Sequence, residues 1–423
     1  MKAFFHVTDL EKVFEYIPRF SQVATEQIPL ADTTGRVLGA DIVSDTDLPE
    51  FMRATMDGYA VRASSTYGAS EGSPAYLNVK GTIVMGESPC FSIGPGECAR
   101  ISTGGMLPEG SDSVVMIEHA EALDSTTAEV YRSVAPGQHV IALGEDFKKG
   151  EIILSRGRKL RPQETGLLAA FGRELVEVYK KPVIGIIATG DEVVPVEEKP
   201  GPGQIRDMNT YTLSGMIKEA GALPLTFGIV RDNYDILLET CSQAIAQSDM
   251  VLISGGSSVG TRDFTIEVLS ALPDSEILVH GISISPGKPT ILASIRDKVF
   301  WGLPGHVTSA MVVFSTVVRP FIEHIGGLGH QRTFTIPALL NRNISSAQGR
   351  VDFTRVRLIK KEGILWAEPV LGKSGLISTM VKADGLVRIG INTEGIDKGT
   401  EVPVIVSCPS SVVSYNGQRT TDD

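Results

Sequence analysis

The spacing of hydrophobic positions divides the chain into regions that favour different secondary structures. From Val7 to Ile17, apolar residues recur at helical spacing, which predicts a short helix that ends before Pro18. From about Ile28 to Leu160, short apolar stretches alternate with clusters of Gly, Pro, Ser and Asp. That alternation is typical of a mainly β region.

From Pro182 onward, strand-like and helix-like segments alternate. The apolar runs VIGIIATG, LPLTFGIV and MVLISGG are separated by predicted helices over about 210–220 and 234–247. Such alternation indicates a parallel sheet with crossover helices, and ligands bind beyond the C-terminal ends of the strands of such a sheet. Three polar segments follow these strands: ATGDE (188–192), GIVRDN (228–233) and SGGSSVGTRD (254–263).

The remaining third of the chain returns to β structure. Residues 298–327 predict a strand, a turn at 302–305 and a long helix that stops at Gly326 and Gly327. After Gln331, β segments are expected near 333–340, 351–359, 363–370, 385–391 and 400–406, before a polar tail. The pattern as a whole predicts a multidomain protein of the α/β plus β class.

Composition narrows the possible functions. A length of 423 residues suggests roughly two to four domains. The net charge of −11 disfavours a nucleic-acid or acidic-membrane partner, because either would require a basic face, but it does not exclude an anionic small ligand. The four scattered cysteines, the start of the chain and the short apolar runs favour a reducing cytoplasm without disulfides, signal peptide or membrane span.

A glycine-rich loop follows the apolar run MVLI. Its residues Ser254, Gly255, Gly256, Ser257, Ser258 and Gly260 precede a helix that is expected to begin near Asp263. Glycines at such a place let backbone N–H groups approach a phosphate. The loop matches neither G-x-G-x-x-G nor a Walker A motif, so a tight strand-to-helix turn is the alternative interpretation.

Acidic residues occur after the same strands. Asp191, Glu192, Asp232 and Asp263 could each be a cap, loop or ion-pair residue. Together they place four carboxylates beside the glycine loop, an arrangement suited to Mg²⁺ bridged to phosphate oxygens. The segment Pro286-Gly287-Lys288-Pro289 adds a fixed turn with one cation and favours contact with an anion.

Two other features leave alternatives open. Asp57-Gly58 in ATMDGYAVR is either a turn signal or a carboxylate presented to a ligand. The histidines show no metal-ligand spacing, although His306 begins a helix next to GLPG, where it could meet an anion.

The order of the motifs resembles the molybdopterin molybdenumtransferase (MoeA) family, which also includes the gephyrin E domain. The matching segments are MDGYA (56–60), ISTGGMLPEGSDSVVMIE (101–118), GEDF (144–147), ATGDE, SGGSSVGTRDF (254–264), PGKP (286–289), GLPG (302–305) and GRVDFTRVRL (349–358). The resemblance implies an α/β molybdopterin-binding domain (1–20 and 178–326), a small split domain (21–45 and 146–177), a β-rich domain (46–145), a C-terminal β-barrel (327–408) and a flexible tail (409–423). It also implies a homodimer whose active sites are shared between subunits.

The implied reaction consumes adenylylated molybdopterin and molybdate, uses Mg²⁺ and releases AMP. Residues that match the family's catalytic positions are Asp57, Thr103, Asp146, Glu192, Asp232, Asp263 and Lys288, with Glu192, Asp232 and Asp263 as the metal-binding candidates. Cofactor-binding candidates are the glycine loop, Pro286, Gly287, Arg350 (or Arg355) and Ser374 (or Ser378). The molybdopterin adenylyltransferase and cofactor-accepting proteins are the implied partners.

Two positions depart from the family pattern. Ser285 stands where many relatives have lysine, and His306-Val307 stands where they usually have Asn-Pro. Either change could accompany a preference for tungstate over molybdate. A non-catalytic, gephyrin-like scaffold and a nucleotide hydrolase or adenylyltransferase are the other interpretations, and the acids at positions 57, 146, 192, 232 and 263 favour the enzyme over the scaffold.

Overall fold

The chain forms two compact units. The computed structural model describes residues 7–255, 261–329 and 334–406. The first unit comprises the chain up to residue 39, residues 156–165 and the chain from residue 175 onward, and the second comprises residues 40–155 and 166–174. A finer division into four domains stays a prediction.

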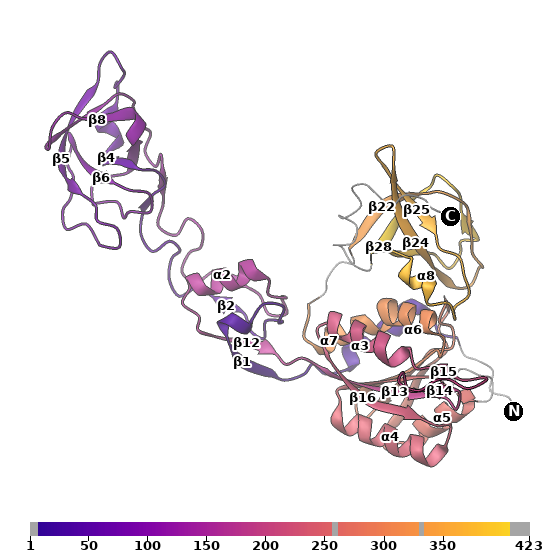
Figure 1. Ribbon diagram of the computed structural model, residues 1–423. Coiled ribbons are helices and arrows are strands. Elements are labelled where there is room, and N and C mark those ends of the chain that lie inside the picture. The colour runs from indigo at the N-terminus through magenta and orange to yellow at the C-terminus, as the bar shows by residue number, and fades with distance from the viewer. Residues whose placement is uncertain (1–6, 256–260, 330–333, 407–423) are drawn as a thin grey trace. The chain divides into compact units, whose positions relative to one another are not determined.

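A six-stranded sheet organises the first unit (Figure 1). Its strand order is β16 (Leu223–Val230), β13 (Val183–Thr189), β17 (Met250–Ser254), β21 (Lys298–Leu303), β20 (Ile291–Ile295) and β18 (Ser275–His280). Neighbours among the first four strands are parallel, so their C-terminal ends lie at one edge. The sequence therefore predicted the parallel part of the sheet correctly.

Helices cover both faces of this sheet (Figure 1). On one face, α3 (Asn209–Glu219), α6 (Val307–Val313) and α7 (Arg319–Ile325) share a core with Ile184 and Ile186 of β13. On the other face, α4 (Tyr234–Gln247) and α5 (Thr261–Ala271) share a core with Ile187. Successive side chains of β13 point to opposite faces of the sheet, and both faces are covered by helices. Every position of the strand after Val183 is therefore buried, which is why its sequence is a continuous apolar run.

The sheet is mainly parallel, as expected, because β20 alone among its six strands runs in the opposite direction. β20 pairs antiparallel with both β21 and β18. Arg296 and Asp297 join β20 to β21, and both have positive φ angles, of 50° and 59°. A two-residue connection of this kind matches the twist of an antiparallel hairpin, so it reverses the strand direction. The predicted turn at 302–305 is also later than expected, because Gly302 and Leu303 still pair with β17.

The N-terminal helix is shorter than its apolar pattern suggests. Helix α1 covers Leu10–Phe14 and buries Leu10 and Val13. A 3₁₀ turn over Ile17–Arg19 follows and includes Pro18 instead of ending before it. Among the described helices, none combines the length and the apolar composition needed to cross a membrane.

A closed five-stranded barrel follows the sheet, so the expected fold class of α/β plus β is confirmed. Its strands are β22 (Thr335–Leu340), β24 (Val351–Lys361), β25 (Ile364–Pro369), β26 (Gly385–Ile389) and β28 (Glu401–Val406). The ring closes because β24 pairs with both β25 and β26, while β28 joins β26 to β22. The short strand β19 (Ile284–Ser285) runs parallel to the start of β24 and joins the barrel to the α/β region.

The second unit is built on another six-stranded sheet. Its order is β7 (Ser113–Met116), β4 (Gly58–Val61), β6 (Glu97–Ile101), β5 (Ala75–Thr82), β9 (Thr127–Val130) and β8 (Ala120–Ala122). Tyr59 and Val61 of β4 belong to one core cluster and Ala60 to another. This unit is therefore the mainly β region that the sequence predicts.

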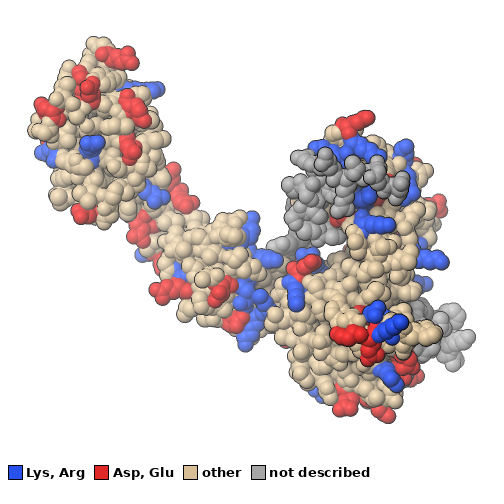
Figure 2. All heavy atoms as spheres, viewed as in Figure 1, with Lys and Arg blue, Asp and Glu red and all other residues tan. Residues whose placement is uncertain are grey.

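Acidic and basic side chains are interspersed over the visible surface of the described residues (Figure 2).

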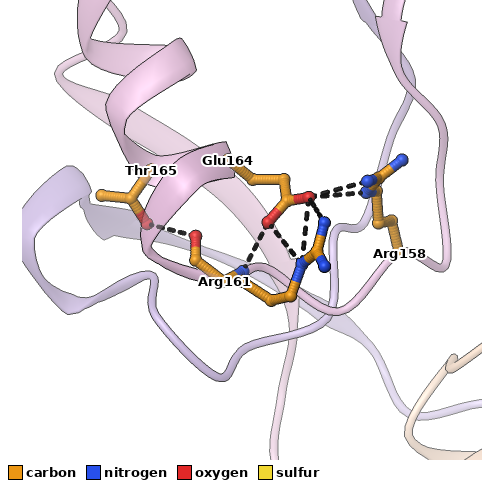
Figure 3. Close-up of polar contacts among 4 residues, drawn as sticks. All are labelled: Arg158, Arg161, Glu164 and Thr165. Atoms are coloured by element: carbon orange, nitrogen blue, oxygen red, sulfur yellow. Dashed lines mark hydrogen bonds and ion pairs between the residues drawn. The ribbon is translucent and has the colours of Figure 1, made fainter.

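A carboxylate stabilises the start of α2 (Pro162–Ala170). Glu164 is 3% exposed and accepts hydrogen bonds from the backbone N–H of Arg161 (2.9 Å) and from the guanidinium groups of Arg161 and Arg158 (both 2.7 Å at Nη2) (Figure 3). The hydrogen bonds from Arg161, followed by those from Arg158, lower the pKa of Glu164 from 4.5 to about 2. Reaching back to a helix-start N–H is the role of the acid in a capping box.

Candidate functional site

The first candidate site is a cleft at the C-terminal edge of the parallel strands, named here the α/β cleft. Its volume is about 510 Å³. Strand ends are where parallel sheets bind ligands, and the sequence predicted a site at this edge. The cleft is lined by Ala188, Thr189, Gly190, Glu192, Val193, Ile205, Arg206, Asp207, Met208, Asn209, Asp232, Ser254, Gly255, Gly305 and His306.

The end of β13 is shaped to hold Glu192. Gly190 has a φ of 144°, and a Cβ atom added there would lie 2.7 Å from Oε2 of Glu192. The absence of a side chain at Gly190 therefore leaves room for the carboxylate to fold back toward the strand end. Glu192 and Asp232 both line the α/β cleft.

Asp232 follows β16 and is fixed by its neighbours. Thr189 Oγ1 donates a hydrogen bond of 2.9 Å to Asp232 Oδ1. The backbone N–H of Asp232 donates to Asp191 Oδ1 at 3.3 Å. Asp191 therefore supports the backbone of Asp232 and does not line the cleft, whereas Glu192, the next residue, does line it.

The glycine loop begins where β13 and β17 approach each other. Gly255 has a φ of 131°, and a Cβ atom there would lie 1.9 Å from the carbonyl oxygen of Thr189, so no larger residue fits. Ser254 is 2% exposed, and its Oγ has no hydrogen-bond partner among the described residues. The predicted ligand residues Gly256, Ser257, Ser258 and Gly260 lie outside the described residues, as does the side chain of Asp263.

Sequence reasoning missed one wall of the α/β cleft. Asp207 and Met208, which connect β15 (Ile205–Arg206) to α3, and Asn209, the first residue of α3, line the cleft. Asn209 Nδ2 donates to the carbonyl of Gly305 at 2.9 Å, whereas its Oδ1 has no partner among the described residues. Asp207 is 8% exposed and accepts a hydrogen bond from the N–H of Thr210. The available signal was a polar Asp-x-Asn segment directly before an amphipathic helix.

A second cleft, named here the barrel cleft, lies between the 282–289 segment and the barrel. Its volume is about 630 Å³. It brings together five of the predicted ligand residues, which lie far apart in sequence: Pro286, Gly287, Lys288, Arg350 and Ser374. Gly287 is required by close packing, since a Cβ atom there would lie 2.3 Å from Cγ2 of Val313.

Two arginines had been alternatives for this region, and they occupy different environments. Arg350 lines the barrel cleft, and its Nε lies 3.0 Å from Asp352 Oδ1. Arg355 instead donates to Thr379 Oγ1 (2.8 Å) and to the carbonyl of Gly372 (2.9 Å). Burial lowers the pKa of the Arg355 guanidinium from 12.5. Arg355 therefore supports the loop that carries Ser374, whereas Arg350, ion-paired with Asp352, lines the cleft.

His306 lines both clefts. Its Nδ1 lies 3.0 Å from Oγ of Ser374. The α/β cleft and the barrel cleft therefore meet at one imidazole ring.

The remaining predicted residues belong to the second unit. These residues are Asp57, Thr103 and Asp146. Asp57 Oδ1 accepts a 2.7 Å hydrogen bond from the backbone N–H of Thr103, so the first two are direct neighbours. Gly58 starts β4, and a Cβ atom there would lie 1.9 Å from the carbonyl of Val115. The Asp-Gly pair is thus a strand start at a close backbone approach, with Asp57 exposed. Asp146 is also exposed.

Oxygen ligands suitable for a hard cation are present in the α/β cleft. Among the residues that the structure describes, no three His, Cys, Asp or Glu side chains form a group that could hold a metal alone. Mg²⁺ usually takes only one or two protein carboxylates and completes its shell with water and substrate phosphates. The pair formed by Glu192 and Asp232 fits that requirement.

Three family models match the chain. The model described as "MoeA N-terminal region (domain I and II)" matches residues 8–172, "Probable molybdopterin binding domain" matches residues 185–324, and "MoeA C-terminal region (domain IV)" matches residues 337–407.

Similar proteins extend over nearly the whole length. A putative molybdopterin biosynthesis protein of Methanocaldococcus jannaschii is 36% identical over 93% of this chain and 94% of its own. A molybdopterin molybdenumtransferase of Bacillus subtilis is 33% identical over 91% of this chain and 90% of its own. The crystal structure of a molybdopterin biosynthesis MoeA protein from Pyrococcus horikoshii has a TM-score of 0.82 at 30% identity and covers 95% of this chain and all of its own.

Proposed function

Because the chain belongs to the MoeA family, we propose that it is a molybdopterin molybdenumtransferase of molybdenum cofactor biosynthesis. In the proposed reaction, adenylylated molybdopterin and molybdate are the substrates, the phosphoanhydride is hydrolysed, molybdenum is left on the dithiolene, and AMP is released. The proposed location is the cytoplasm, with the adenylyltransferase that supplies the substrate and the acceptors of the cofactor as partners.

One observation carries this proposal. Glu192 and Asp232 share the α/β cleft with Ser254 and Gly255, at the edge where parallel strands end. Carboxylates beside a glycine turn suit a phosphate group that binds together with Mg²⁺. Ser254 Oγ and Asn209 Oδ1 are buried without partners among the described residues, and polar groups of a ligand would satisfy them.

The proposed division of roles combines these positions with the family resemblance, which supplies Asp263. Glu192, Asp232 and Asp263 would hold Mg²⁺ and orient the attacking water. When bound, Mg²⁺ neutralises negative charge on the phosphate oxygens. Lys288, with Arg350 and Ser374, would receive the oxyanion in the barrel cleft, which all three residues line.

The direct test is turnover. The full chain is incubated with adenylylated molybdopterin, molybdate and Mg²⁺, and AMP release and cofactor formation are followed. We expect both products, and AMP at the background level would refute the enzyme and leave the scaffold interpretation. Parallel reactions with equal concentrations of tungstate measure the metal preference, which the departures at Ser285 and His306 leave open.

The proposed homodimer shares each site between subunits, with Asp57 of one chain serving the α/β cleft of the other. Asp57→Asn and Asp263→Asn are each expected to be inactive. Mixing and re-equilibrating the two inactive variants should restore about a quarter of the wild-type AMP release, because half of the dimers are mixed and one of their two sites is intact. No recovery in mixtures that contain heterodimers would contradict the shared site.

A further inference from the structure

The loop that carries Ser374 is attached to the start of α6 by three hydrogen bonds. The backbone N–H of Thr308 donates to the carbonyl of Ser374 at 3.2 Å. Thr308 Oγ1 donates to the carbonyl of Leu376 at 3.3 Å. The third is the 3.0 Å contact between His306 Nδ1 and Ser374 Oγ, and among the described residues it is the one that engages the Ser374 hydroxyl.

His306 is suited to control this hydroxyl. It is the N-cap residue of α6, yet its side chain makes no capping hydrogen bond to the helix. The imidazole therefore remains available to Ser374. His306 and Ser374 also line the barrel cleft together with Lys288 and Arg350, the two cationic side chains of that cavity.

A serine hydroxyl has one proton and rotates freely unless a neighbour fixes it. If His306 Nδ1 carries a proton, the ring donates to Ser374 Oγ, and the hydroxyl proton is left to point into the barrel cleft. An anion bound beside Lys288 and Arg350 favours this arrangement, because it accepts hydrogen bonds and cannot donate them.

We infer that His306 is a positioning residue that orients the Ser374 hydroxyl as a hydrogen-bond donor to a tetrahedral oxyanion in the barrel cleft. This inference rests on the proposed function, in which molybdate is a substrate. It makes His306 act through Ser374, so the two side chains contribute to one interaction.

A double-mutant cycle measures that coupling. Molybdate alone is titrated calorimetrically into the full chain carrying His306→Ala, Ser374→Ala or both changes. We expect each single change to weaken binding about 5- to 20-fold, since hydrogen bonds to charged groups are worth more than neutral ones. The double variant should bind no more weakly than Ser374→Ala, because the interaction is already lost. His306→Gln, which keeps an N–H donor, should recover part of the affinity.

Thr308→Val is the matched structural control. It removes the hydrogen bond to Leu376 from the same attachment but lies outside the lining of both clefts. We expect the affinity of Thr308→Val for molybdate to equal that of the wild type. In the AMP-release assay, His306→Ala should raise the KM for molybdate more than it lowers kcat. Additive losses in the cycle, or an equal loss in Thr308→Val, would overturn the positioning role.

The experiment separates this inference from the proposed function. If molybdate binds and Lys288→Ala weakens binding while His306→Ala does not, only the role of His306 is refuted. If the wild-type chain binds no molybdate, both the oxyanion site and the role of His306 are refuted.

Discussion

Replacing Gly255 with alanine should distort the α/β cleft more than adding a methyl group at Gly190, the glycine that follows β13. The added Cβ atom would lie 1.9 Å from the carbonyl oxygen of Thr189, whereas real Cβ contacts essentially never fall below 3.0 Å. The ends of β13 and β17 would have to separate by about 1 Å. A displacement of that size in a positioned site can reduce turnover about a hundredfold.

The expected loss of stability has two parts. Alanine at a φ of 131° is strained, and a disfavoured backbone conformation costs about 1–2 kcal/mol. Inserting a methyl group into a filled space adds about 1–3 kcal/mol. The free energy of unfolding of the first unit should therefore fall by about 2–5 kcal/mol, a decrease in melting temperature of about 5–15 °C.

Gly228→Ala is the matched control. Gly228 also has a positive φ, of 81°, but a Cβ atom there would meet nothing within 4 Å. Its substitution imposes the backbone strain without the collision. Thermal unfolding and AMP release of both variants test the argument. If Gly255→Ala were as stable and as active as Gly228→Ala, the close approach of Thr189 would not be what requires glycine.

Two further substitutions test the site and the fold. Asp232→Asn should reduce AMP release about a hundredfold or more. It should not unfold the chain, since the amide oxygen can still accept the hydrogen bond from Thr189. Asp235 is an exposed acid outside the cleft, so the control variant Asp235→Asn should leave turnover unchanged. Glu164→Gln should cost about 2–3 kcal/mol at neutral pH by removing a carboxylate that accepts several charged hydrogen bonds. Because the pKa of Glu164 is lowered from 4.5 to about 2, the stabilisation by its carboxylate is present above pH 4.5 and is lost as the pH falls toward 2. In acid denaturation, Glu164→Gln should therefore lose less stability than the wild type between pH 4.5 and pH 2.

The fold was predictable wherever burial dictated the sequence. Strands β13 and β17 are buried on both faces, so each is a short apolar run, and the helices between them are amphipathic. The reversed direction of β20 was not predictable in this way. It depends on the hairpin through Arg296 and Asp297 that joins β20 to β21, and these residues lack the glycine or asparagine that marks such turns.

The site was only partly predictable, because neighbours in sequence have different surroundings. Asp191 and Glu192 are adjacent acids, yet one supports a backbone N–H and the other lines the α/β cleft. Asn209 joins the same cleft through a hydrogen bond to Gly305, a contact between residues almost a hundred positions apart. Local patterns do not encode such contacts. The family resemblance, which the comparisons confirm, named Arg350 and Ser374, and both line the barrel cleft, while their role there stays a prediction.

The charges of the two clefts explain why a chain with a net charge of −11 can accept anionic substrates. Among the side chains that the structure describes, the α/β cleft is lined by Glu192, Asp207 and Asp232 and by one Lys or Arg, Arg206. That guanidinium is already bonded through Nε to the carbonyls of residues 196 and 198. A phosphate entering this cleft would meet net negative charge, which the proposed Mg²⁺ between the carboxylates and the phosphate would reduce. The barrel cleft is lined by two cations, Lys288 and Arg350, of which Arg350 is ion-paired with Asp352, so its local charge favours an anion more than that of the α/β cleft does. Separate environments for the two anions, joined at His306, thus follow from local charge and not from the composition of the chain.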